Sequence, residues 1–135
     1  MSAEADYIKA ESRNILKTVE LIEALLAKES LPMYETIALG KLLQDIYTGI
    51  ERILRSLLQA GGVEIKKTET WHKDLLLAAS EKELISEQHF EAFRNLLLFR
   101  HLQIHGYGYM LDENRLRELA APIPGLCKDF LDSID

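Results

Sequence analysis

A short segment, residues 100–109, gathers ionisable side chains at the point where an apolar helix runs out into glycine. Imidazoles titrate near neutrality, so a histidine can take or give a proton. A guanidinium stays charged and can hold two phosphate oxygens at once. Metal-independent cleavage of an RNA phosphodiester needs these groups, because the 2′-hydroxyl must lose a proton, the leaving oxygen must gain one, and the phosphorane needs positive charge. The candidate residues are Arg100, His101, His105, Tyr107 and Tyr109.

The spacing of Arg100 and His105 limits how they can act together. Residues five apart on a regular helix point about 140° apart, so one narrow helix face cannot hold both. They converge if the helix ends near His105, as Gly106 suggests, or if a second copy contributes. Two such helices at a twofold axis would pool two arginines and two histidines in one cleft. The run Leu-Leu-Leu-Phe at 96–99 is apolar on all sides, so we expect a homodimer with this helix at the axis.

The same residues also have structural interpretations. Arg100 has the spacing of an arginine that lays its stem on apolar surface and pairs with an acid of the second helix, Asp45 or Glu51. His101 and His105 are four apart and share a helix face, so a two-histidine metal site is an alternative. No third ligand lies nearby in the sequence, and we therefore predict no metal.

Another arginine–histidine pair is open. Arg94 and His101 are separated by six residues, but we favour His105 because Tyr107 follows it at a one-residue interval. Tyr107 and Tyr109 would otherwise be loop tyrosines that pack an end of the bundle. The remaining two histidines, which we interpret as surface or helix-start residues, are His72 and His89.

Composition narrows the class of protein. The 135 residues are 47% hydrophobic, which predicts a single globular domain over residues 1–135. The net charge of −6 disfavours an extended basic RNA-binding face and leaves a compact site or a groove shared by two subunits. Cys127 is the only cysteine, so it cannot form an intrachain disulfide, and we expect it in the core of the last helix. We find no signal peptide and no membrane span, and predict a cytoplasmic protein.

Apolar residues recur at helical spacing along most of the chain, and glycine, proline and capping residues divide it. This pattern predicts an all-α, up-and-down bundle of about five helices, built on two long antiparallel ones. Pro122 and Pro124 should break or kink the last helix near Ala121. The predicted helices extend from the cap at Ser2 to about Glu29, and then over residues 33–60, 71–79, 86–105 and 113–134.

The Arg-x4-His-x-Tyr spacing of Arg100, His105 and Tyr107, at the end of an apolar helix in a small all-helical chain, resembles the signature of the HEPN superfamily and, within it, of the HepT-type toxins. The segments YTGIERILRSLL in the second helix and WHKDLLLAA before the motif helix are also similar to family positions. The resemblance extends over essentially the whole chain. The family often has asparagine after the arginine, whereas this chain has His101, which we assign a supporting role.

The resemblance implies a HEPN helical bundle and a function. It implies a metal-independent endoribonuclease toxin of a type VII HepT/MNT toxin–antitoxin pair, with RNA as its substrate and no cofactor. Its partner would be an MNT-type nucleotidyltransferase antitoxin that transfers AMP from ATP to Tyr107, with Tyr109 as a second acceptor. The alternatives are a non-catalytic HEPN domain that binds a nucleotide or a nucleotidyltransferase, and a dimeric interaction module in which Arg100 is structural.

Overall fold

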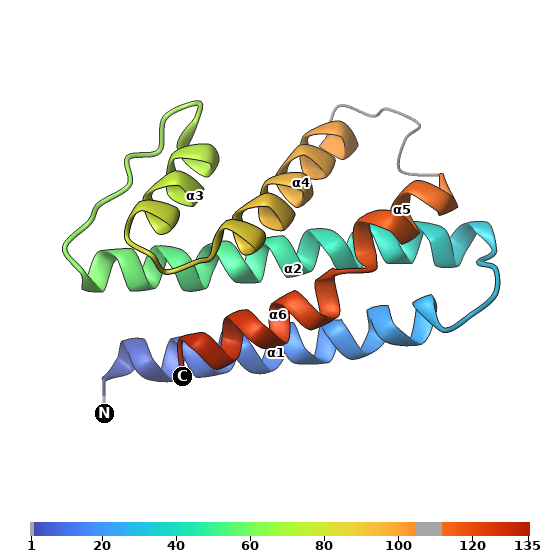
Figure 1. Cartoon of the computed structure of the whole chain (residues 1–135), viewed down its shortest axis with the longest axis horizontal. Helices are drawn as coiled ribbons and strands as arrows, with labels where there is room; N and C mark the ends of the chain where they lie inside the picture. Colours follow the sequence, from blue (N-terminus) through green and yellow to red (C-terminus); the bar gives the residue numbers. More distant parts are fainter. Residues whose placement is uncertain (1, 105–111) are drawn as a thin grey trace.

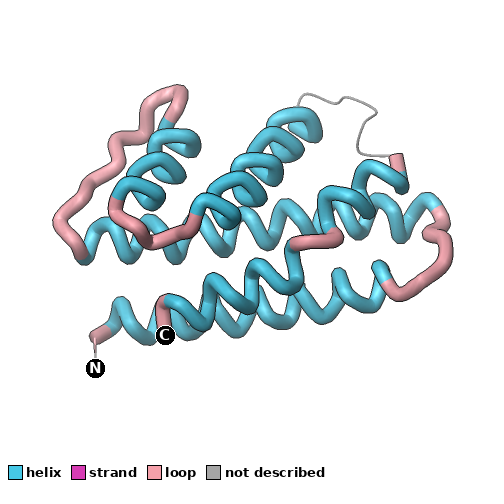
Figure 2. Tube along the Cα trace, in the orientation of Figure 1, coloured by secondary structure: helices cyan, strands magenta, loops and turns pink. Residues whose placement is uncertain are grey.

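The computed structural model describes residues 2–104 and 112–135, and every regular element in these ranges is a helix (Figures 1 and 2). This confirms the predicted all-α bundle. The helices are α1 (Ala3–Leu26), α2 (Met33–Ala60), α3 (Trp71–Glu81), α4 (Glu87–Ile104), α5 (Glu113–Ala120) and α6 (Ile123–Ser133).

The two long helices α1 and α2 run antiparallel along the molecule, as the sequence predicts (Figure 1). Gly49 lets them approach closely, because a Cβ atom at this position would lie 2.8 Å from Cγ1 of Ile15. Side-chain oxygens accept from backbone N–H groups at the starts of α1 and α5. Ser2 Oγ accepts from the backbone N–H of Ala5 at 3.1 Å and caps α1.

The end of α1 differs from the expectation. The helix ends at Leu26 instead of near Glu29, and the chain then turns so that Leu31 enters the core. Arg117 of α5 stabilises this earlier end, because its guanidinium donates to the carbonyl oxygens of Leu26 at 3.4 Å and Lys28 at 2.8 Å. A cation bound to the last carbonyls of a helix also complements the helix dipole. This contact joins residues that are far apart in the sequence.

The last predicted helix is broken, as the prolines indicate. The segment divides into α5 and α6 at Ala121 and Pro122, where the proline lacks the N–H that would continue the helix. The helix α6 then runs beside α1, and it carries Cys127 and Phe130 into the core. The predicted burial of Cys127 is confirmed, and burial raises the pKa of its thiol to about 12.

The helices α3 and α4 both contact α2, and they lie on the side of it that faces away from α1 (Figure 1). The run 96–99 in α4 is divided between inside and outside. Leu96 and Phe99 are buried in the core, whereas Leu98 is exposed. Within residues 2–104 and 112–135, we find no helix with the length and apolar character needed to cross a membrane.

Candidate functional site

Arg100 lies in the last turns of α4, and its side chain is 30% exposed. Its Nη1 atom is 4.0 Å from Oε1 of Glu51 in α2. The alternative in which Arg100 pairs with an acid of the second helix is therefore confirmed for Glu51. Asp45 is instead bound to Lys41, one turn earlier on the same helix, at 2.6 Å.

Glu51 is the centre of the site. Its side chain is only 8% exposed, although carboxylates are rarely buried without partners. The second oxygen, Oε2, lies 2.5 Å from Nδ1 of His72, the second residue of α3. One buried carboxylate thus joins α2, α3 and α4 through an arginine and a histidine.

His72 is not among the site residues that the sequence predicts. Of the predicted descriptions, surface or helix-start residue, the second is right, but the ring is partly buried and 28% exposed. The available signal was Glu51 itself. This acid lies four residues after Tyr47 and three before Leu54, on the apolar stripe of α2, where an unpaired charge would be costly.

Tyr47 lies one turn before Glu51 and is completely buried. Burial raises the pKa of its phenol well above the ordinary value, the Glu51 carboxylate adds to that rise, and Arg100 opposes it. Within the described ranges the hydroxyl has no hydrogen-bond partner in good geometry, although it lies beside the carboxylate. Tyr47 therefore stays neutral beside Glu51 and leaves Arg100 and His72 as the residues that contact the carboxylate oxygens.

Two further cations lie close to His72. The ring of Trp71 is next to the imidazole, with centroids 3.8 Å apart. The guanidinium of Arg55 lies 5.9 Å from the Trp71 ring centre, and Nζ of Lys67 lies 5.5 Å from it. Both are within the range of a cation–π interaction. Positive side chains are thus concentrated locally around the α2–α3 contact of a chain whose net charge is −6.

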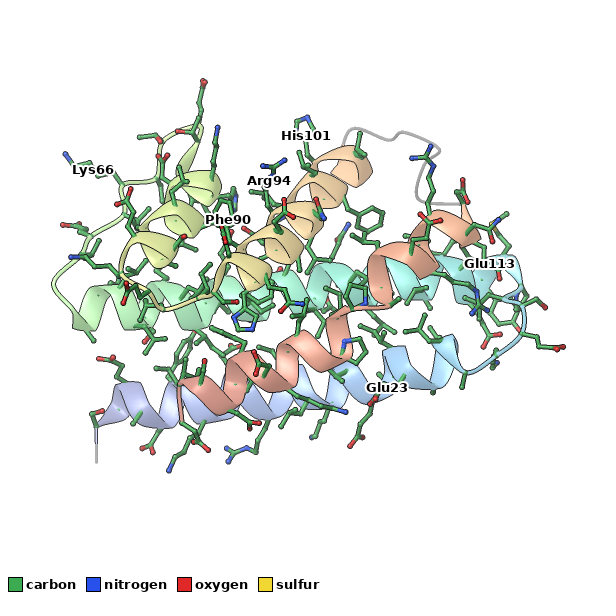
Figure 3. The ribbon with its side chains drawn as sticks, in the orientation of Figure 1. Glu23, Lys66, Phe90, Arg94, His101 and Glu113 are labelled. Carbon is green, nitrogen blue, oxygen red and sulfur yellow. The ribbon has the colours of Figure 1, made fainter. Side chains whose placement is uncertain are left out.

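The other motif residues are placed only in part. Arg94 and His101 are exposed on α4, on the side of the molecule that faces away from α1 (Figure 3). His105, Tyr107 and Tyr109 lie outside the described residues. The described part of the chain contains no group of three or more histidine, cysteine, aspartate or glutamate side chains that could hold a metal ion.

His89 has a different environment: of the two predicted descriptions, helix-start residue is right and surface residue is wrong. It lies in the first turn of α4 with a buried ring, and both ring nitrogens are engaged. Nδ1 accepts from the backbone N–H of Ser86 at 3.3 Å, and Nε2 lies 2.8 Å from Oδ2 of Asp129 in α6. The ring also stacks on Phe93. His89 thus holds α4 against α6 and has no ring nitrogen left for a substrate.

A groove of ≈ 390 Å³ runs between α4 and α5 beside the motif end of α4. The exposed Leu98 is part of its wall. Its lining residues are Asn95, Leu98, Phe99, Leu102, Arg115, Leu116, Glu118 and Leu119. The groove combines apolar side chains with a few polar ones, as the contact surfaces of proteins do.

Comparison with known protein families identifies the family of this chain. A family model described as "HepT-like protein" matches residues 38–135, which include Tyr47, Glu51, His72 and Arg100. No curated protein and no solved structure matches the chain. The matched range contains α3 to α6 and nearly all of α2, and therefore every element that contributes to the Glu51 site.

Proposed function

This chain belongs to the HepT-like protein family, and from that membership we propose that it is a metal-independent endoribonuclease toxin of a HepT/MNT toxin–antitoxin pair. The single observation that carries the proposal is the setting of Arg100. Its guanidinium is partly exposed at the motif end of α4, and a buried carboxylate fixes it from behind. Such an arrangement presents a pre-oriented cation to an anionic ligand, which is what stabilisation of a phosphorane requires.

The length of the Arg100–Glu51 contact supports this role. At 4.0 Å the pair is an ion pair without a direct hydrogen bond, so Glu51 orients the guanidinium and leaves its N–H donors for phosphate oxygens. A short bidentate pair would instead have used those donors. In the proposal, Arg100 binds the scissile phosphate and His105 transfers a proton, with His101 in a supporting role.

The proposed active form is a homodimer in which two α4 helices meet. Leu98 is exposed next to the α4–α5 groove, and burial of this surface against a second copy would remove apolar area from water. The dimer would bring two copies of Arg100 and His105 into one cleft. A monomeric mass by light scattering at high concentration would exclude this composite cleft.

The proposed partner is an MNT-type nucleotidyltransferase antitoxin. It would transfer AMP from ATP to Tyr107, or to Tyr109 as a second acceptor. The adenylyl group carries a phosphate charge and a purine, so beside Arg100 it would occupy the place of the RNA phosphate. The proposal thus assigns both activity and its control to one end of α4.

Cleavage by the purified protein is the direct test of the proposed activity. Arg100→Ala and His105→Ala should each abolish RNA cleavage and keep the helical circular dichroism signal, and His101→Ala should have a weaker effect. Cleavage should persist in EDTA and leave 2′,3′-cyclic phosphate ends. Arg13→Ala, at an exposed position of α1, is the matched control and should cleave like the wild type.

Mass spectrometry tests the proposed control. Co-expression with the cognate nucleotidyltransferase should add one or more adenylyl groups to the chain and silence it. Tyr107→Phe should remain toxic in the presence of the partner, and Tyr107→Phe combined with Tyr109→Phe tests the second acceptor. Inhibition of the wild type without any mass change would replace modification by simple occlusion.

A second candidate is a non-catalytic domain that binds a nucleotide or a nucleotidyltransferase subunit. Two observations favour it: Arg100 already has an acidic partner in Glu51, and the net charge of −6 gives no long-range attraction to RNA. In this case the purified wild type would not cleave RNA, but it would bind ATP or the nucleotidyltransferase, and Arg100→Ala would weaken that binding.

A further inference from the structure

We propose that His72 is a second proton-transfer residue of the site, oriented by Glu51 and placed beside Arg100 within one chain. The inference rests on the proposed ribonuclease function and extends it. An Arg-x4-His motif supplies one histidine per chain, whereas cleavage of a phosphodiester involves one proton removed and one delivered, so a single chain needs a second proton-transfer group or the histidine of a second copy. The structure supplies a histidine for the other transfer from α3, outside the motif.

The geometry of His72 is that of an imidazole held by a carboxylate. Nδ1 lies 2.5 Å from Oε2 of Glu51, and the carboxylate is far more deeply buried than the ring. The acceptor at Nδ1 selects the neutral tautomer with its hydrogen on that nitrogen, which leaves a lone pair on Nε2. Within residues 2–104 and 112–135, Nε2 makes no hydrogen bond. A nitrogen with a lone pair on a partly exposed, fixed ring is the requirement for a general base.

Arg100 and His72 share Glu51 but contact different oxygens of its carboxylate. Oε1 faces Arg100 and Oε2 faces His72, and the side chains of both partners are exposed to about the same extent, 30% and 28%. A phosphate bound by the outer N–H groups of Arg100 would therefore lie on the exposed side of the carboxylate, next to the imidazole. The base and the phosphate-binding group come from α3 and α4, and α2 fixes their relative positions.

The step can be written in full. His72 Nε2 takes the proton of the 2′-hydroxyl, the 2′-oxygen forms a bond to phosphorus, and the bond from phosphorus to the 5′-oxygen breaks. The 5′-oxygen leaves with a proton from His105, the general acid of the proposed function. The products are a 2′,3′-cyclic phosphate and a 5′-hydroxyl. His72 is then an imidazolium, and Glu51 stabilises its positive charge until the proton passes to water.

The charged groups around His72 come from several elements. Helix α2 provides the Glu51 carboxylate and the neutral Tyr47, and α4 provides Arg100. Arg55 and Lys67 reach the Trp71 ring, which lies against the imidazole. Apart from Glu51, the charges at these positions are positive, so they favour the approach of a phosphate to the imidazole.

Kinetics on a synthetic single-stranded RNA of mixed sequence, labelled at its 5′ end, test the inference with the full chain. His72→Gln should lower kcat by about 100-fold, the order of one general base, and the acid-side limb of the pH–rate profile should disappear. KM should stay within about threefold, since phosphate binding by Arg100 is kept. Imidazole added to His72→Ala should restore part of the rate, which a structural role would not allow.

Two further variants complete the test. Glu51→Gln keeps the size of the side chain but loses the charge that orients both partners, so it should lower kcat and shift the acid-side limb without removing it. His89→Gln is the matched control on α4, because its ring nitrogens are both engaged. It should keep the pH–rate profile of the wild type. Circular dichroism and thermal melting of each variant confirm that it is folded.

The outcomes separate this inference from the proposed function. If the wild type cleaves RNA, Arg100→Ala does not, and folded His72→Gln keeps the wild-type rate and profile, the role of His72 is wrong and the ribonuclease stands. If the wild type cleaves no RNA in vitro or in cells, both fall. Loss of the acid-side limb in His72→Gln together with rescue by imidazole establishes the assignment.

Discussion

Among residues 2–104 and 112–135, two pairs of histidine and carboxylate have inverted burial. In the pair of His72 and Glu51, the carboxylate is 8% exposed and the imidazole reaches solvent. In the pair of His89 and Asp129, the imidazole is 5% exposed and the carboxylate is 72% exposed. The same two functional groups therefore present opposite partners to the surface.

Which member of the pair is buried determines whether the histidine can meet a ligand. A buried carboxylate fixes and polarises an imidazole that can still meet a ligand, whereas a buried imidazole with both nitrogens engaged can only hold the structure. His89 ties the start of α4 to α6 through Ser86 and Asp129. His72 connects α3 to the same buried acid that faces the motif arginine. Proximity of a histidine to a carboxylate does not by itself identify a catalytic pair, and the direction of burial provides the distinction.

The largest effect on stability is expected at His89. His89→Ala removes a buried ring that stacks on Phe93 and contacts Phe130, and it removes two hydrogen bonds. We expect the free energy of unfolding to fall by about 3 kcal/mol, as for truncation of a buried aromatic side chain. Urea unfolding followed by circular dichroism measures this change.

His72→Gln is the matched comparison for His89→Ala. Its ring is partly exposed, and the glutamine amide can still donate to Glu51, so the loss should stay below about 1 kcal/mol. A loss equal to that of His89→Ala would mean that both histidines are structural, and the contrast between the two pairs would be lost.

An intermediate effect on stability is expected at alkaline pH. It comes from the phenol of Tyr47, which lies beside Glu51. Its folded-state pKa is raised above the ordinary value of 10.0 by burial and by Glu51. Below that pH both states keep the proton, and above it the unfolded state loses the proton while the folded state retains it. The contribution of Tyr47 to the free energy of unfolding should therefore fall by about 1.4 kcal/mol per pH unit above pH ~10.

Urea unfolding of wild type and Tyr47→Phe at pH 9 to 11 checks this, since phenylalanine removes the titrating group. The difference in stability between the two proteins should be constant below pH ~10 and should then change in favour of the variant. Parallel curves over the whole range would show that Tyr47 does not titrate with folding. Burial also raises the pKa of the Cys127 thiol in α6, so both proteins should share a further loss of stability at alkaline pH, and only the difference between them reports Tyr47.

The sequence predicts the elements of this fold better than their contacts. The apolar stripe and the flanking Pro32 and Gly61 give α2 the same bounds that the structure has, because periodicity and helix breakers are local properties. The end of α1 was predicted three residues too late. That end depends on Arg117, which reaches it from α5, and no local signal reports such a contact.

The site divides in the same way. Arg100 can be identified from its spacing within one helix and its position before glycine, which are both local. The partnership of Glu51 with His72 joins residues 21 apart through the crossing of α3 over α2, and that of His89 with Asp129 joins residues 40 apart. Burial of an acid on the apolar stripe of α2 indicates that it needs a cationic partner. The sequence does not show which residue this is, because that depends on how α3 and α4 cross α2.

The smallest expected effect is at Asp129, and it tests whether the exposed member of a pair matters less than the buried one. Asp129 Oδ2 lies 2.8 Å from Nε2 of His89, and the acceptance of a hydrogen bond at Nδ1 places the ring hydrogen on Nε2. Asp129→Ala leaves this buried N–H without its acceptor and should lower the free energy of unfolding by about 1 kcal/mol. Asp129→Asn keeps an oxygen that can accept the hydrogen bond and should cost less than about half as much, because the exposed carboxylate charge adds little in water.

Urea unfolding at low and high salt measures both variants. Equal losses for Ala and Asn that disappear in high salt would show that His89 is held by charge, and the interpretation that its hydrogen bonds hold α4 against α6 would then be wrong.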